Sequence, residues 1–276
     1  MVEGATHGAV PLQSIPQQRV VEKLDDYMSR RDYAGAERHL LYWLEEACAA
    51  GDARGELMVR NELVGHFRKT GNREQAFLHA ENALRLVDEL DFGATISAGT
   101  TYTNVATAFN AFGENERSLE LFRKAASLYE GSSRTQPQLL GGLYNNMALT
   151  CIALGRFSEA DELYNRALEV MEGVESGQLE QAITYLNMAD AATAKAQAAC
   201  GGSEEDALLD AACEQDVERC LDTALALLDT PSVPRDGYYA FVCEKCAPVF
   251  AHYGYFLADE DLRNRAKAIY EDNRES

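Results

Sequence analysis

The stretch Leu143–Leu168, LYNNMALTCIALGRFSEADELYNRAL, decides the fold. Apolar residues recur every three to four positions on both sides of Gly155, which is the spacing of two amphipathic helices. Glycine tolerates the positive φ at which helices end, so Gly155 is expected to separate the two helices. Two asparagines, Asn145 and Asn146, stand in the middle of the first helix, although asparagine is a below-average helix former. The stretch therefore predicts a helical hairpin with an unusual polar pair.

The same pattern recurs upstream at a fixed period. Gly71, Gly113 and Gly155 follow one another at intervals of 42 residues. Small residues stand five and twelve positions after these glycines: Ala76, Ser118 and Ala160, then Ala83, Ala125 and Ala167. A single hairpin cannot bury both of its apolar faces, whereas a stack of hairpins can. The period therefore predicts a solenoid of helix pairs.

Weaker copies of the pattern flank the three clear ones, and no alternating strand segment competes with them. We predict an all-α solenoid over residues 18–273, preceded by a flexible leader over residues 1–17. Its six helix pairs are expected at about residues 18–48, 57–90, 97–130, 138–173, 179–229 and 237–273. The fifth pair is longer than the others, which predicts an insertion near residues 199–213.

Composition narrows the function classes. The chain has 276 residues, of which 46% are hydrophobic, and its 45 acidic and 25 basic residues give a formal charge of -20. Binding to nucleic acid or to an anionic membrane relies on Lys and Arg, so neither partner is expected. A neutral or basic peptide partner fits the charge. Neither a spanning apolar segment nor a signal peptide is recognisable, which favours a cytoplasmic protein.

The order of Tyr144, Ala148, Gly155, Ala160 and Ala167 resembles the tetratricopeptide repeat. The period exceeds the 34 residues of the basic repeat, and the sequence is similar to the longer-helix variety of kinesin light chains and many bacterial proteins. The resemblance implies a right-handed α-solenoid, and a non-enzymatic scaffold whose first helices line a concave groove for a protein or peptide. Residue positions can therefore be assigned to that groove by register.

The position nine residues before the glycine is expected to face the groove. It holds, in successive pairs, Glu62, Asn104, Asn146, Asn187 and Lys245. An amide offers both a donor and an acceptor, and by resemblance the three asparagines bind the backbone of an extended peptide. They can instead bond to the neighbouring repeat and set its twist, and both interpretations stay open. Asn145 matches Asn61 but no asparagine in the other helix pairs, so no continuous row of groove asparagines is predicted at this position.

Further groove candidates lie one turn along the same face: Arg68, Lys69, Thr107, Asn110 and Asp190. Arg68 and Lys69 can anchor a ligand carboxylate. Chaperone-binding carboxylate clamps, however, have an asparagine at the place of Glu62. A solvated helix end is therefore the favoured interpretation of the two basic residues.

No catalytic, cofactor or metal site is predicted. Cys213, Cys220, Cys243 and Cys246 offer four thiols for zinc, but Cys246 falls at an inner helix position, which favours a core role. The histidines lack metal-ligand spacing, and no nucleophile elbow or phosphate-binding glycine loop is present. The alternative function is structural: a protein that self-associates through its end or convex surfaces, so a homo-oligomer is left open.

Overall fold

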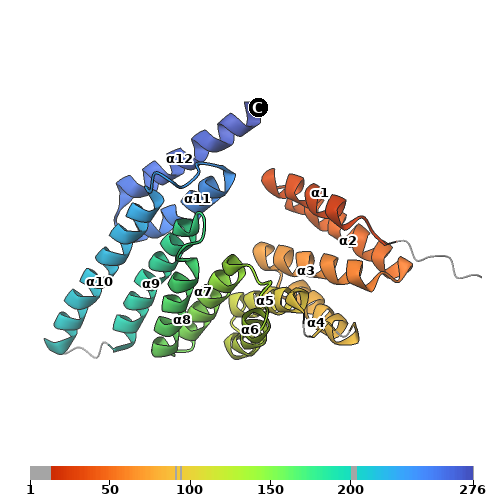
Figure 1. Cartoon of the computed structure of the whole chain (residues 1–276), viewed down its shortest axis with the longest axis horizontal. Coiled ribbons are helices and arrows are strands. Elements are labelled where there is room, and N and C mark those ends of the chain that lie inside the picture. The colour runs from red at the N-terminus through yellow and green to blue at the C-terminus, as the bar shows by residue number, and fades with distance from the viewer. Residues whose placement is uncertain (1–13, 91, 94, 200–203, 276) are drawn as a thin grey trace, which may run out of the picture. The chain divides into compact units, whose positions relative to one another are not determined.

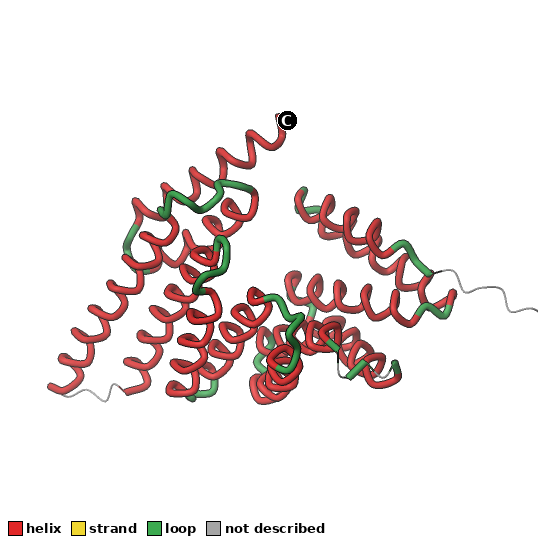
Figure 2. Tube along the Cα trace, viewed as in Figure 1, coloured by secondary structure: helices red, strands yellow, loops and turns green. Residues whose placement is uncertain are grey.

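The computed structural model describes residues 14–90, 92–93, 95–199 and 204–275. All regular secondary structure in these ranges is α-helical (Figure 2). The helices are α1 Gln17–Ser29, α2 Tyr33–Ala50, α3 Ala53–Thr70, α4 Arg73–Glu89, α5 Ile96–Ala111, α6 Asn115–Glu130, α7 Pro137–Ala153, α8 Phe157–Met171, α9 Gly177–Ala199, α10 Glu204–Leu228, α11 Gly237–His252 and α12 Phe256–Glu275 (Figure 1). They follow one another as the six helix pairs that the period predicts.

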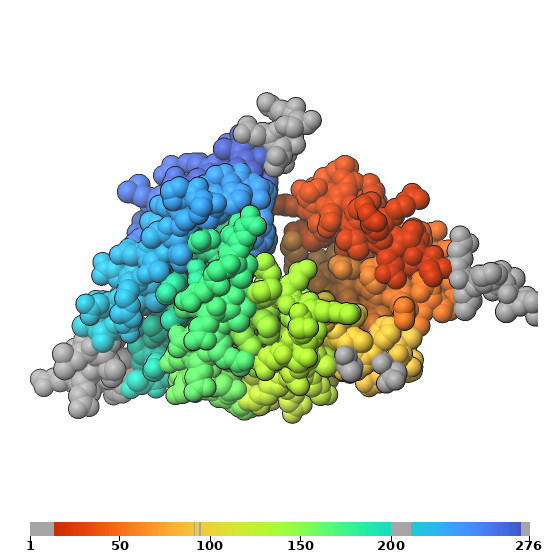
Figure 3. Space-filling view, viewed as in Figure 1, coloured from red at the N-terminus to blue at the C-terminus, as the bar shows by residue number. Residues whose placement is uncertain are grey.

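Contacts divide the chain into two compact units, residues 1–128 and residues 129–276. Each has its own core, and we describe each by itself; the single solenoid over residues 18–273 stays a prediction. In the second unit α7 packs on α8, α9 on α10 and α11 on α12, and α9 also contacts α7, α8 and α11. Their side chains form a continuous surface on the face shown (Figure 3). Neighbouring pairs thus cover each other's apolar faces within a unit.

Glycines close the turns between the paired helices, as the register predicts. Gly71, Gly113, Gly155 and Gly254 have φ angles of 76°, 83°, 69° and 83°. This left-handed conformation is costly for residues with a Cβ atom. It lets the chain reverse within two or three residues, so the second helix of each pair packs directly against the first.

Small residues line the contact between the paired helices. Ala76, Ala83, Ala160 and Ala167 have no exposed surface. Alanine lets two helix axes approach closely, and the larger side chains fill the space between neighbouring pairs. The small positions of the 42-residue pattern are therefore packing positions.

Ile15, which the sequence places in the predicted flexible leader over residues 1–17, is packed against the first unit. Residues 1–13 lie outside the described residues, but Ile15 is buried in the core of the first unit. Its backbone N–H donates to the Asp52 carboxylate at 3.0 Å. Ile15 is thus held beside the start of α3, because its apolar side chain and its backbone donor both find partners there.

The extra residues of the fifth pair lengthen its helices. α9 has 23 residues and α10 has 25, whereas α7 and α8 have 17 and 15. The predicted insertion near residues 199–213 falls on the end of α9, on residues 200–203, which lie outside the described residues, and on the start of α10. Much of the predicted insertion is therefore helical.

Two arginines of the second unit each bind an acidic residue and a tyrosine. Arg166 of α8 bonds to Glu130 at 2.8 Å, and its guanidinium lies 4.3 Å from the centre of the Tyr144 ring. Arg265 of α12 bonds to Asp229 at 2.5 Å and donates to the hydroxyl of Tyr239 at 2.9 Å. We call these two arrangements of acid, arginine and tyrosine the clasps.

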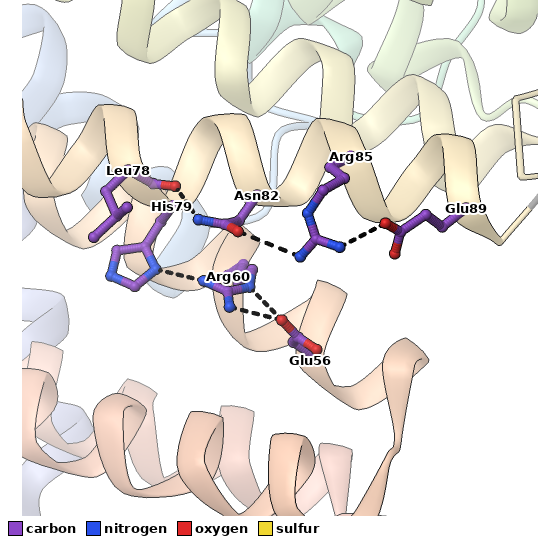
Figure 4. Close-up of polar contacts among 7 residues, drawn as sticks. All are labelled: Glu56, Arg60, Leu78, His79, Asn82, Arg85 and Glu89. Atoms are coloured by element: carbon purple, nitrogen blue, oxygen red, sulfur yellow. Dashed lines mark hydrogen bonds and ion pairs between the residues drawn. The ribbon is translucent and has the colours of Figure 1, made fainter.

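The first unit has two buried histidines: His79 of α4, which packs against α3, and His66 of α3, which faces Glu37 of α2. His79 is 4% exposed, stacks on Phe67, and accepts a bond from Arg60 at 3.3 Å through Nδ1 (Figure 4). Arg60 is itself paired with Glu56 at 2.6 Å. Burial, and to a lesser degree the charge of Arg60, lowers the pKa of His79 to about 4. Burial also lowers the pKa of His66, against the opposing effect of Glu37.

We predict that the first unit loses stability as the pH falls from about 6.5 towards 4. A histidine with a lowered folded-state pKa is protonated more readily in the unfolded chain, so acid favours unfolding in this window. For His79, whose pKa falls from 6.5 to about 4, the loss is on the order of 2 to 3 kcal/mol. Urea unfolding between pH 7.5 and 4.5 measures it.

The His79→Phe variant separates this effect from the titration of the carboxylates. It keeps an aromatic ring beside Phe67 but cannot be protonated, so its stability should fall less steeply with pH than that of the wild type. His252→Phe is the matched control, because His252 is exposed. Parallel pH profiles for wild type and His79→Phe would contradict the assignment.

Candidate functional site

The five register positions predicted to face a groove lie on first helices of their pairs. Glu62 and Asn104 belong to α3 and α5 of the first unit, and Asn146, Asn187 and Lys245 belong to α7, α9 and α11 of the second. Lys245 is exposed, and the other four are half-buried. Each unit thus presents its own set of polar side chains on consecutive first helices.

Asn145, the residue for which the sequence predicts no role, ties α7 to α9. Its side chain is 5% exposed, and its Nδ2 donates to Thr184 Oγ1 at 2.8 Å and to the Gly141 carbonyl at 3.3 Å. Its Oδ1 accepts a bond from Asn187 at 3.1 Å. Hydrogen bonds to its donors and its acceptor offset the cost of removing this amide from water.

The first unit repeats the same arrangement. Asn61 Nδ2 on α3 donates to Thr101 Oγ1 on α5 at 3.0 Å and to the Leu57 carbonyl at 3.1 Å. Asn104 Nδ2 donates back to Asn61 Oδ1 at 3.5 Å. We call Asn61, Thr101 and Asn104, and likewise Asn145, Thr184 and Asn187, the amide triads.

The triads correct the interpretation of Asn145. The match of Asn145 to Asn61 is a pattern after all, because both join their helix to the next first helix. Asn104 and Asn187 each donate one N–H to the neighbouring repeat, as expected if the groove asparagines set the twist between repeats. Each still has a second N–H and a carbonyl oxygen.

Asn146 differs from its neighbour. It is half-buried, and its side chain has no hydrogen-bond partner among the residues that the structure describes. The adjacent asparagines of LYNNMA therefore divide between an internal tie and an amide that is free to bind.

A cleft of about 630 Å³ opens beside the triad of the first unit. Three elements line it: the start of α1, the face of α3 and the start of α5, together with the loop before α5. The lining residues are Gln17, Arg54, Leu57, Met58, Asn61, Glu62, Phe92, Thr95, Ser97, Thr100 and Asn104. The cleft thus brings the predicted Glu62 and Asn104 together with Arg54, which sequence reasoning missed.

Two uncompensated charges stand in this cleft. Arg54 lies 5.1 Å from the centre of the Phe92 ring and has no ion-pair partner among the described residues. Glu62 likewise has none, and burial together with the charge of Asp25 raises its pKa. The cleft therefore carries a cation and an anion on one helix, each available to a ligand.

The candidates one turn further along are mostly engaged. Lys69 lies 5.5 Å from the centre of the Tyr33 ring, and Asn110 Nδ2 donates to Asn115 at 3.2 Å. Thr107 bonds to the backbone of its own helix at 2.8 Å. Arg68 is exposed at the end of α3. The two basic residues occupy the last turn of a helix, where cations are favourable without any ligand.

Asp190 is held by the last helix pair. The Tyr253 hydroxyl donates to Asp190 at 2.9 Å and lies 2.9 Å from Thr193 Oγ1. Burial raises the pKa of Tyr253 to about 12 and also raises the pKa of Asp190. This predicted groove residue thus joins α9 to the end of α11.

Of the four cysteines considered for a zinc site, three lie in packed surroundings. Cys220, Cys243 and Cys246 are buried in the core of the second unit. Burial raises the pKa of Cys246 to about 12, which keeps its thiol protonated. Among the described residues no group of His, Cys, Asp and Glu has a metal-binding arrangement. None of the described helices combines the length and apolar character needed to cross a membrane.

Comparisons with known proteins agree with the helix pairing. The model of the tetratricopeptide repeat matches residues 142–170, which comprise most of α7 and α8. A putative kinesin light chain from Podospora anserina with nearly identical TPR-like repeats is 16% identical with a TM-score of 0.51, covering 81% of this chain and 98% of that chain. BtubC from P. vanneervenii is 17% identical with a TM-score of 0.47, over 95% and 93%. A search of curated proteins finds no match.

These findings confirm the predicted resemblance and the all-α solenoid fold. Residues 142–170 form a tetratricopeptide repeat, and the chain has the fold of kinesin-light-chain-like repeat proteins. That fold suggests an interaction or scaffold role with protein partners.

We predict opposite effects for the two adjacent asparagines. Asn145→Ala removes the bond that Thr184 Oγ1 accepts and the acceptor that Asn187 Nδ2 uses, and it should lower the free energy of unfolding by about 2 to 3 kcal/mol. Asn146→Ala removes no internal bond and should change it by less than about 0.5 kcal/mol. Urea unfolding of both variants checks this, and equal losses would show that Asn145 is no tie.

Proposed function

We propose that this chain is a non-enzymatic scaffold whose first helices bind an extended segment of a partner protein. The observation that carries the proposal is the free amide of Asn146 beside the bonded amide of Asn145. An amide in the middle of a helix, half-exposed and without an internal partner, is unfavourable for the helix itself. Pairing with the N–H and C=O of a ligand backbone accounts for it.

The remaining bonding groups of Asn104 and Asn187 support the same role. Each of these asparagines donates one N–H to the other asparagine of its triad, so its side chain is oriented before a ligand binds. A fixed amide loses less conformational entropy on binding than a mobile one. In the proposal the triads hold the amides and the free atoms bind the peptide, so the structural and binding interpretations apply together.

The cleft of the first unit supplies a place for such a segment. Its volume of about 630 Å³ and its mixture of amide, hydroxyl, apolar and charged side chains suit a short peptide. The lining charges, one positive and one negative, do not favour a polyanion. The formal charge of -20 likewise favours a neutral or basic partner.

We expect Ser97→Trp to abolish peptide binding at this cleft, because the indole would occupy the space between α3 and α5. A random-peptide display library selected on the full chain supplies the ligands, and fluorescence anisotropy measures their affinities. Asn146→Ala should weaken peptides that bind the second unit by about three- to tenfold, the value of one hydrogen bond.

Ser127→Trp is the matched control for the blocking variant. Ser127 is an exposed serine on α6 of the same unit and does not line the cleft. If no peptide is selected, or if neither Ser97→Trp nor Asn146→Ala weakens any selected peptide, the proposal is wrong.

Self-association is a second candidate, and exposed apolar side chains favour it. Phe256 is 69% exposed and Leu257 is 84% exposed, both in the first turn of α12. Large apolar groups in this state are typical of a surface that a partner covers. Their place in the last helix pair fits assembly through an end surface.

The variant Phe256→Ser/Leu257→Ser tests this candidate. If the two side chains are buried between copies, their removal should weaken dimerisation by at least about tenfold. Light scattering over a range of protein concentrations measures the change. A wild type that stays monomeric at the highest concentration would exclude the candidate without affecting the proposed peptide binding.

A further inference from the structure

The charges in the cleft of the first unit are ordered along α3. Arg54, Met58 and Glu62 are four residues apart and therefore lie on one face of the helix. All three line the cleft. With a rise of about 1.5 Å per residue, the spacing between neighbours on this face is about 6 Å, and Arg54 and Glu62 are about 12 Å apart. Along α3 the wall of the cleft is therefore positive at Arg54, apolar at Met58 and negative at Glu62.

An extended peptide has nearly the same spacing. Residues two apart in a strand point to the same side and are about 6.6 Å apart, so residues four apart are about 13 Å apart. A segment lying along α3 would present its first, third and fifth side chains to Glu62, Met58 and Arg54. In the opposite chain direction, the same side chains would meet these three residues in the reverse order. The match holds for extended segments, because residues four apart in a helix are only about 6 Å apart.

The two charges are available for this purpose. The Arg54 guanidinium rests on Phe92, which fixes it without neutralising it. Glu62 has a like charge, Asp25, as its electrostatic neighbour on α1. Both charged groups therefore gain from an opposite charge on a ligand, and a segment of uniform charge would gain at one end and lose at the other.

Asn104 provides a backbone contact near the Glu62 end of the cleft, because it bonds to Asn61, the neighbour of Glu62 in the sequence. One of its N–H groups is held by Asn61, and the other N–H and the carbonyl oxygen remain for the ligand. Met58 is half-buried and packs against the apolar core of α1 to α4, so it offers apolar surface at the midpoint. Charge, apolar surface and amide thus converge on a five-residue segment.

We propose that this cleft takes an extended segment in which an acidic and a basic side chain stand four residues apart with an apolar residue midway. The inference rests on the proposed peptide-binding function and names the chemistry of the partner. The ligand is a protein segment with alternating side chains, and neither a free amino acid nor a polyanion spans the two charges.

Capped five-residue peptides test the inference on the full chain. Leucine occupies the third position and threonine the second and fourth, while the ends are glutamate and lysine, two lysines, or two glutamates. The wild type should prefer the mixed peptide by about threefold to fivefold, the range of exposed ion pairs. Arg54→Glu should shift the preference to the two-lysine peptide, and Glu62→Lys to the two-glutamate peptide.

Arg38→Glu is the matched control, because Arg38 is an exposed arginine on α2 that does not line the cleft. It should leave the preference at that of the wild type. Circular dichroism verifies folding, and the milder Arg54→Gln and Glu62→Gln variants, which should each abolish the preference at one end, replace any variant that does not fold.

The outcomes distinguish this inference from the proposed function. If library peptides bind in a manner blocked by Ser97→Trp, while Arg54→Glu and Glu62→Lys change no charge preference, the inference is wrong and the proposed function stands. If no peptide binds the wild type at all, both are wrong. A wild type that prefers a uniformly charged peptide also overturns the inference.

Discussion

The fold depends on apolar surface that no helix pair can bury alone. Within a pair, fully buried alanines such as Ala83 and Ala167 let the two helices approach each other closely. Stability is therefore shared between adjacent pairs, as in other repeat arrays. Apolar packing requires each pair to contact the next, and buried polar side chains determine the register in which the two pairs pack.

The amide triads determine that register. Apolar packing alone tolerates sliding of one helix along another, whereas a buried amide with directional bonds has one favourable position. Asn145 can satisfy Thr184 and Asn187 together only when α7 and α9 are in a single register. The same bonds orient Asn187, whose remaining atoms are the proposed contacts for a peptide. Packing specificity and the proposed binding thus use the same side chains.

The sequence allowed the helices, the turns and the register to be predicted, because each rests on local chemistry. Gly71 and Gly155 mark turns, and the small residues after them mark close helix contacts. The triads were missed because their signal alternates between pairs. Asparagine stands ten residues before the glycine in the second and fourth pairs. Threonine stands twelve residues before the equivalent position in the third and fifth pairs, which is Gly113 in the third and Ala196 in the fifth. A search for one residue type per position does not detect such complementary positions.

The cleft could not be predicted for a different reason. Arg54 carries no repeat signal, and its role depends on the loop that places Phe92 beneath it. Asp190 accepts a hydrogen bond from Tyr253, which is 63 residues away in the sequence. Register assigns a residue to a face of its helix, but it does not say which distant side chain already occupies that face.

The clasps have a consequence for lengthening the array by design. Glu130 and Arg166, like Asp229 and Arg265, are 36 residues apart, which is shorter than the 42-residue period. A tandem duplication of residues 130–171 would therefore carry acid, tyrosine and arginine together in each copy. Every new junction would bring its own complete set of surface contacts, so synthetic arrays of chosen length can be assembled from this one block without redesigning the joints.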